Sequence, residues 1–289
     1  MGNTFSNLLP VISTDFGIQF AAYAIAAPLQ TDRFYDFTGS MTYLICVLAS
    51  LANNRLKEHS VPAILELLKD LHPRQLLVSA TTILWCVRLG SYLLYRISKH
   101  GKDSRFDKIK VNPVRFFVAW FLQGVWVYLT AFPVYVVNVT PVAELSPIGL
   151  LDYIGFSMWL IGFGFETIAD IQKIRWQNRL GNDRHHKFIN EGLWSISRHP
   201  NYFGEMLLWA GNAVTCSSAF SHLGVVGLRT AVTFAISPVF VYQLINNVSG
   251  VNLLEKASDK KFKDVKEYLT YKKNVPILVP RLFPKLKKD

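Results

Sequence analysis

A cluster of polar side chains stands at the edge of an apolar run, between residues 192 and 205. The stretch reads Gly-Leu-Trp-Ser-Ile-Ser-Arg-His-Pro-Asn-Tyr-Phe-Gly-Glu. Its arginine, histidine, asparagine, tyrosine and glutamate are the side chains that bind nucleotides or move protons. Polar groups so close to hydrocarbon are costly unless something binds them. We therefore expect the chemistry of this chain at this segment.

The spacing within the segment predicts separate roles. Pro200 suits the first position of a helix, because its missing N–H would be unpaired there anyway. A helix amino terminus beside Arg198 can hold a phosphate. Asn201 and Glu205 are four residues apart and face the same way, so that one could hold a carboxamide and the other orient or protonate a substrate. Tyr202 is a further candidate proton donor, with an interfacial anchor as the alternative.

A second polar group follows the apolar run that ends at residue 165. Glu166, Asp170 and Lys173 are spaced four and three apart, with no glycine or proline between them. The helix is expected to continue into the cytosol, where this shared face could meet the ribose or amide of a nucleotide. A solvated helix end with an internal ion pair is the alternative. Adjacent His185 and His186 point about 100° apart on a helix, so no metal site is expected there.

Two more regions carry candidate residues. Arg88 lies in the middle of an apolar run and must face the bundle interior, where Tyr92, one turn on, could donate a hydrogen bond to a substrate carbonyl. An intramembrane ion pair is the alternative for Arg88. Glu255 and Lys256 follow the last apolar run, and the basic, aromatic stretch 268–276 could cover an adenine and a phosphate. A surface amphipathic helix is the other interpretation of that stretch.

The elements that position these residues are predicted membrane helices. Hydrophobic residues make up 51% of the chain and gather in long runs with the charges between them, as in an integral membrane protein. About seven helices are expected in one all-α bundle with a cytosol-facing cofactor site. Four runs are clear, 76–97, 114–138, 148–169 and 223–246, and three are shorter, 16–30, 37–52 and 203–219. Residues 1–75 carry no recognised motif, and 76–289 form the motif-bearing domain.

Charge distribution predicts the orientation. Lysine and arginine crowd into 96–115, 172–200 and 255–288, whereas 140–147 has none, so the positive-inside rule places the first three regions and the carboxyl terminus in the cytosol. The net charge of +11 then reflects orientation, and no nucleic-acid signature is present. The tail from Lys285 fits a dilysine retrieval signal for the endoplasmic reticulum, with a basic tail on anionic lipid as the alternative. Met1 to Ser6 fits an N-myristoylation pattern, which conflicts with a lumenal amino terminus.

From about residue 75 to 282 the chain resembles the membrane steroid 5-alpha-reductase and sterol-reductase superfamily, most closely its DUF1295 branch. The likeness is strongest in 192–205, in the Asn-Val-Ser-Gly-x-x-Leu-Leu-Glu stretch ending at Glu255, and in 268–280. The resemblance implies that Asn201 contacts NADPH and that Glu205 lines the same site. It further implies a set of residues near the cofactor: Glu166, Asp170, Lys173, Arg175, Trp194, Arg198, His199, Glu255, Lys256, Tyr271 and Lys272.

The superfamily mechanism implies hydride delivery from NADPH to a polarised carbon–carbon double bond of a hydrophobic lipid, completed by a proton. Glu205, Tyr92 and Tyr202 are the candidate catalytic residues. The run 37–52 has no acidic residue to match the glutamate that grips the steroid ketone in the reductases, so a steroid is no better supported than another enone. Membrane methyltransferases using S-adenosylmethionine share an Arg-His-Pro-x-Tyr motif but generally lack the glutamate. A non-catalytic lipid-binding protein is the third interpretation.

Overall fold

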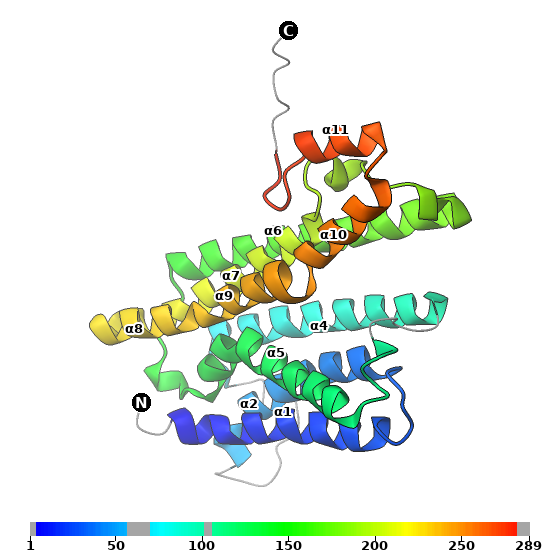
Figure 1. Cartoon of the computed structure of the whole chain (residues 1–289). Helices are drawn as coiled ribbons and strands as arrows, with labels where there is room; N and C mark the ends of the chain where they lie inside the picture. Colours follow the sequence, from blue (N-terminus) through cyan, green and yellow to red (C-terminus); the bar gives the residue numbers. More distant parts are fainter. Residues whose placement is uncertain (1–3, 57–69, 101–105, 282–289) are drawn as a thin grey trace. The chain divides into compact units, whose positions relative to one another are not determined.

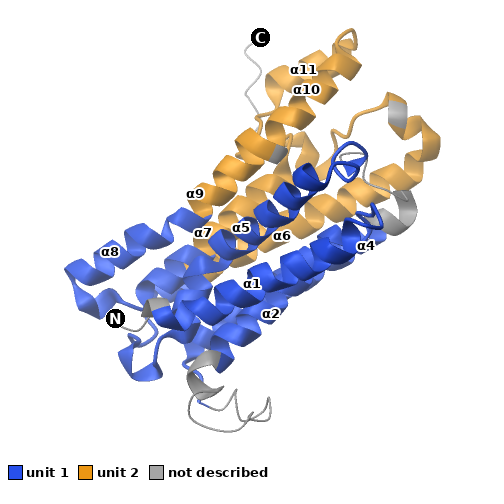
Figure 2. Cartoon of the chain, turned by 60° about the horizontal axis from the view of Figure 1, so that its bottom comes forward, with its two compact units in different colours: residues 1–153, 212–237 blue, residues 154–211, 238–289 orange. Residues whose placement is uncertain are grey.

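The computed structural model describes residues 4–56, 70–100 and 106–281, and in this part of the chain the secondary structure is helical without strands (Figure 1). The main helices are α1 (Thr4–Ala26), α2 (Tyr35–Leu56), α4 (Pro73–His100), α5 (Pro113–Val139), α6 (Leu150–Leu180), α7 (Pro200–Ser218), α8 (Val225–Phe234), α9 (Ile236–Gln243), α10 (Val251–Phe262) and α11 (Lys266–Asn274). The chain forms two compact units: unit 1 contains 1–153 and 212–237, and unit 2 contains 154–211 and 238–289 (Figure 2).

Unit 1 is built around a bundle in which α1, α2, α4 and α5 pack against one another. Aromatic rings fill the contacts; for example, Tyr43 meets Trp85 and Trp126 edge-on, with ring centroids 5.2 and 5.1 Å apart. Such pairs add to the free energy gained by burying apolar surface. All three cysteines of the chain are buried and free of disulfides.

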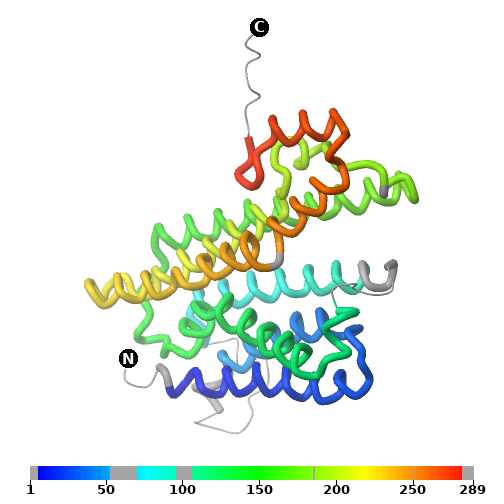
Figure 3. Tube along the Cα trace, viewed as in Figure 1, coloured from blue at the N-terminus to red at the C-terminus, as the bar shows by residue number. Residues whose placement is uncertain are grey.

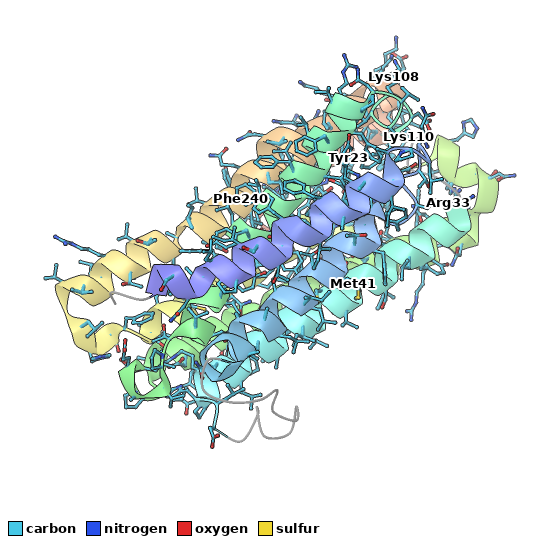
Figure 4. All side chains as sticks on the ribbon, turned by 90° about the horizontal axis from the view of Figure 1, so that it is seen from below. Tyr23, Arg33, Met41, Lys108, Lys110 and Phe240 are labelled. Atoms are coloured by element: carbon cyan, nitrogen blue, oxygen red, sulfur yellow. The ribbon has the colours of Figure 1, made fainter. Side chains whose placement is uncertain are left out.

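Basic residues gather at one end of this bundle, where Figure 4 labels Arg33, Lys108 and Lys110. The Lys110 ammonium lies 2.7 Å from the Asp32 carboxylate, and the hydroxyl of Tyr23 donates to the Pro113 carbonyl at 3.2 Å. These contacts join the turn between α1 and α2 to the start of α5. The loop at the other end of α5, 140–147, contains no lysine or arginine.

A buried ion pair fixes that other end. The guanidinium of Arg74 donates to both carboxylate oxygens of Asp152, at 2.7 and 2.8 Å, and to the carbonyls of Ser146 and Pro147. Arg74 is 0% exposed and Asp152 2%. Two desolvated charges are tolerable only because their hydrogen bonds are this complete. Arg74 therefore ties the start of α4 to the loop before α6.

Unit 2 depends on close packing between α6 and the first three turns of α7. A Cβ atom on Gly204 would lie 2.5 Å from both the Glu166 nitrogen and the Gly162 oxygen, and one on Gly211 would lie 2.5 Å from the Gly155 oxygen. Glycines seven residues apart on each helix thus let the two backbones touch, the small-residue contact common between membrane helices. This contact brings the polar end of α6 against the beginning of α7.

Five stretches are long and apolar enough to cross a membrane: Ser6–Ala26, Pro73–Tyr95, Pro113–Val139, Leu150–Arg184 and Val225–Phe262. The predictions of an all-helical fold and of membrane helices are confirmed. The other two predicted runs, 37–52 and 203–219, lie on α2 and α7. As predicted, α6 continues well past residue 165, and α7 begins at Pro200.

One predicted boundary is wrong. The first run is predicted at 16–30, but α1 begins at Thr4 and ends at Ala26, because Asp15 interrupts the apolar run in the sequence yet is fully buried within the helix. The last predicted run, 223–246, falls at the start of the apolar stretch Val225–Phe262, but its helix is irregular. α8 ends at Phe234, α9 carries Pro238, which cannot donate a helical hydrogen bond, and a π-helical turn follows at Leu244–Ser249.

Candidate functional site

The contact between α6 and α7 places a buried amide against a buried carboxylate. The Asn201 side-chain nitrogen donates to the Asp170 carboxylate at 3.2 Å, and Asp170 is 5% exposed. The oxygen of the same amide, Asn201 Oδ1, is buried without a hydrogen-bond partner in the described structure. A buried acceptor left unpaired costs about 1–3 kcal/mol. The amide is thus held in one orientation, and its oxygen accepts no hydrogen bond from the described residues.

A tight turn before α7 places an indole next to the same helix. Gly192 has φ +59°, and Gln172 of α6 fills the space where its Cβ would be; the side-chain oxygen of Gln172 accepts from the Leu193 N–H at 2.9 Å. Trp194 is buried and donates from Nε1 to the Ala169 carbonyl at 3.0 Å. The Lys173 ammonium lies 5.0 Å from the centre of its ring, within cation–π range.

The segment leading into α7 pairs with the carboxyl-terminal segment. The Arg198 N–H donates to the Pro276 carbonyl at 2.9 Å, the His199 N–H to Ile277 at 3.0 Å, and the Arg281 N–H to the Ile196 carbonyl at 2.9 Å. In Figure 3 the trace turns back after α11 and runs beside the segment that precedes α7. Residues almost 80 positions apart in sequence therefore hold Arg198 and His199 in place.

One carboxylate gathers three basic side chains at the start of α7. Glu255 of α10 lies 2.6 Å from Arg198 Nη1, 2.8 Å from His199 Nε2 and 3.8 Å from Lys272 Nζ. Arg198 Nη1 and Glu255 are close enough for an ion pair, but Nη1 does not form a hydrogen bond to the carboxylate. Arg198 Nε is likewise buried without a hydrogen-bond partner in the described part of the chain. The guanidinium can therefore still donate to an anion. The His199 ring also stacks on Tyr202, with ring centroids 5.7 Å apart.

Helix α11 closes the same cluster. Lys272 contacts the Asp259 carboxylate at 2.5 and 2.6 Å, and Tyr268 donates to Asp259 at 3.0 Å. The Tyr271 hydroxyl donates to the Trp194 carbonyl at 2.6 Å. Burial is the main cause that raises the pKa of both phenols above the ordinary value. These tyrosines therefore act as neutral hydrogen-bond donors that attach α11 to the cluster.

Most of the predicted cofactor residues thus lie in two sets of contacts within unit 2. One set joins α6 to Asn201 and Trp194, and the other surrounds Glu255. Of the other predicted residues in that unit, Glu166 is buried on α6 and Glu205 is half-buried one turn inside α7 from Asn201. Arg175 and Lys256 are exposed, and neither joins the contacts just described. Among the described residues no group of three or more histidine, cysteine or acidic side chains could hold a metal ion.

The two residues predicted on the 76–97 run lie in unit 1. The Arg88 guanidinium is 5.9 Å from the centre of the Tyr92 ring, so these side chains share a face of α4, as their four-residue spacing predicts. The predicted catalytic role of Tyr92 stays a prediction. The dilysine pattern at 285–289 and the start of the myristoylation pattern, including Gly2, lie outside the described residues.

Sequence reasoning missed several polar residues. Asp259 belongs to the cluster around Lys272 and accepts from Tyr268 of the predicted stretch 268–276, but it lies in a charged run typical of a solvated helix. Asp15 is 0% exposed in the middle of α1, and neither of its oxygens has a hydrogen-bond partner among the described residues. Extending the first predicted helix towards the amino terminus would have identified Asp15 as an intramembrane carboxyl, a type of residue that is functional by default.

Comparison with known proteins yields one match. The family model described as Protein of unknown function (DUF1295) matches residues 22–275, which is most of the chain and includes α6, α7, α10 and α11. No curated protein and no solved structure matches the chain.

Proposed function

The chain belongs to the DUF1295 family, and on the geometry of unit 2 we propose that it is an NADPH-dependent oxidoreductase that reduces a carbon–carbon double bond of a hydrophobic lipid in the membrane. The link to the steroid 5-alpha-reductase superfamily is part of this proposal and rests on the motifs at 192–205, 247–255 and 268–280. The substrate class is an enone-like or unsaturated lipid, which can reach a helical membrane protein through the bilayer.

The unpartnered oxygen of Asn201 is the observation that carries the proposal. It is buried, its amide nitrogen is occupied by Asp170, and it accepts no hydrogen bond within the described structure. A ligand that brings an N–H to this oxygen would recover the roughly 1–3 kcal/mol that the unpaired acceptor costs. The carboxamide of a nicotinamide ring is such a donor, so the residues present fit the cofactor.

The basic side chains beside this amide fit the rest of a dinucleotide. Arg198 and Lys272, which both lie beside Glu255 in the structure, would bind phosphate through their remaining N–H groups. Lys173 and Trp194 form a cation–aromatic surface on which a ring could stack. Bound NADPH would supply a hydride to the substrate. Glu205, on the same face of α7 as Asn201, would orient the substrate or supply the proton, with Tyr202 as a second donor.

The membrane arrangement completes the proposal. α2 and α7 would add two spans to the five apolar stretches, giving seven, with the candidate site and the carboxyl terminus in the cytosol. The endoplasmic reticulum is the proposed location, on the strength of the terminal lysine pattern and the charge distribution.

The test is the thermal stability of the detergent-purified protein with NADPH, NADH and S-adenosylmethionine in parallel, since a ligand that binds the native state raises its apparent stability. We expect a shift with NADPH. Asn201→Ala should abolish that shift while the ligand-free protein still unfolds cooperatively. Asn190→Ala, an exposed asparagine of unit 2, is the matched control and should keep the shift.

The other outcomes separate the competing functions. A shift with S-adenosylmethionine alone would identify a methyltransferase and overturn the reductase. No shift with any of the three ligands would favour a non-catalytic lipid-binding protein. A shift with NADPH that survives Asn201→Ala would mean that the assigned site is wrong.

A further inference from the structure

Unit 1 contains a cavity remote in sequence from the motifs used above. Its volume is about 330 Å³, and it is lined by α1, the carboxyl-terminal end of α5, the loop after α5, and α8. This volume is within the range of small-ligand sites. Most of the wall is apolar, with the side chains of Leu8, Phe132, Val136 and Phe234 contributing to it. The cavity therefore suits a hydrocarbon chain.

Three threonines in the wall do not make it polar. The hydroxyls of Thr140, Thr230 and Thr233 donate to the backbone carbonyls of Val136, Val226 and Arg229, respectively, at 2.7, 2.9 and 2.9 Å. Each hydroxyl donates to a backbone carbonyl four residues earlier, so none of the three is a free hydrogen-bond donor for a ligand in the cavity. A ligand with a polar interior would find few partners here.

Among the described residues that line this cavity, Arg229 and Glu144 are the charged ones. Both are exposed, they have opposite charge, and neither forms an ion pair with the other or with any further residue of the described structure. An apolar cavity bordered by one free cation and one free anion is complementary to a zwitterion that carries a hydrocarbon chain.

The position of the cavity fits a lipid headgroup. Helix α5 has 27 residues, or about 40 Å at 1.5 Å per residue, which is enough to cross a bilayer. The cavity adjoins its carboxyl-terminal end, whereas Lys108, Lys110 and Arg115 lie at its amino-terminal end. The two charged residues are therefore placed at the level of the headgroups on the face opposite the basic loops.

We propose that this cavity is a binding site for a zwitterionic glycerophospholipid, with one acyl chain inside, the phosphate on Arg229 and the headgroup ammonium on Glu144. A purely anionic lipid would satisfy Arg229 but bring its phosphate near the Glu144 carboxylate. A neutral lipid would leave both charges unpaired. The site is separate from the proposed reductase site and does not depend on the activity of that site.

The test measures lipid binding by native mass spectrometry of the full chain in detergent, with phosphatidylethanolamine, phosphatidylglycerol and diacylglycerol of matched acyl chains. We expect phosphatidylethanolamine to bind about tenfold or more tightly than the other two, and Arg229→Gln and Glu144→Gln each to lose about tenfold in its affinity. Equal affinity for phosphatidylethanolamine and phosphatidylglycerol, or no effect of either variant, would overturn the proposal.

A second pair of variants tests the cavity itself. Thr233→Trp should fill it and abolish phosphatidylethanolamine binding. Thr270→Trp is the matched control, because Thr270 is an exposed helical threonine that likewise donates to the carbonyl four residues earlier, at 3.0 Å, and it should bind lipid normally. Retained binding by Thr233→Trp would contradict the site. If that variant does not fold, the two variants of exposed charged residues still decide the question.

Discussion

The contact between α6 and α7 makes a quantitative prediction about Gly204. In Gly204→Ala the new Cβ would lie 2.5 Å from backbone atoms of Glu166 and Gly162, and backbone cannot rotate away as a side chain can. An ordinary contact is about 3.5–4.0 Å, so the helices must separate by about 1 Å. Overpacking of this kind costs about 1–3 kcal/mol, which should appear as a lower Tm.

The same displacement reaches the candidate cofactor site. The Asn201–Asp170 hydrogen bond is 3.2 Å long, and a separation of about 1 Å would take it beyond hydrogen-bonding distance. Gly204→Ala should therefore weaken NADPH binding as well as lower the Tm, although residue 204 offers a ligand no side chain.

Gly164→Ala is the matched control for both effects. It lies on α6 two residues after Gly162, but a Cβ there meets nothing within 4 Å. Replacing a helical glycine by alanine without a clash stabilises by about 0.5–1 kcal/mol, so the Tm of this variant should be equal or higher. The assay is thermal unfolding in detergent with and without NADPH. A Gly204→Ala protein with the Tm of the parent chain would refute the packing argument.

Three further predictions concern stability. The pKa of Tyr271 is raised in the folded state, which therefore holds the phenol proton more tightly than the unfolded state does. The contribution of Tyr271 to folding stability is complete at neutral pH and declines as pH rises above about 10. Tyr271→Phe should lower the Tm at neutral pH and flatten the loss of stability in alkaline unfolding curves. Asp152→Asn leaves a fully buried guanidinium uncompensated and should cost about 3–5 kcal/mol, measured as loss of folded protein on size-exclusion chromatography; normal yield and Tm would contradict this ion pair's role. Gly192→Ala should lower the Tm more than Gly181→Ala does. Both glycines have positive φ, +59° and +52°, which costs alanine about 1–2 kcal/mol. Only alanine at position 192 places its Cβ against Gln172, so an equal loss of Tm in the two variants would count against that contact.

Much of the architecture follows from local patterns. Long apolar runs predict helices because hydrocarbon leaves no other partner for backbone groups, and Pro200 predicts where α7 begins because proline fits the first helical position. Asn201 follows Pro200 directly, so the sequence also predicts that it lies in the first turn of α7. Its contact with Asp170, by contrast, depends on glycines of two helices meeting, which no single helix pattern contains.

Other features were beyond local reasoning for physical reasons. The predicted first run begins after Asp15, because a charged residue lowers the hydropathy of the segment that contains it. In the structure Asp15 lies within α1 and is fully buried. Glu255 could be selected as a candidate, but two of its three basic partners, Arg198 and His199, are 57 and 56 residues away from it in the sequence. Such distant pairings are decided by tertiary packing, and spacing along the chain carries no information about them.

The pairing of the segment before α7 with the last described residues has a consequence for how the protein is made. Pro276, Ile277 and Arg281 leave the ribosome almost 80 residues or more after Ile196, Arg198 and His199, yet they hold the backbone of those residues. The membrane helices can be inserted one after another during translation. The candidate site, however, can be completed only after residue 281 has been made, so a chain truncated before residue 276 would reach the membrane without a finished site.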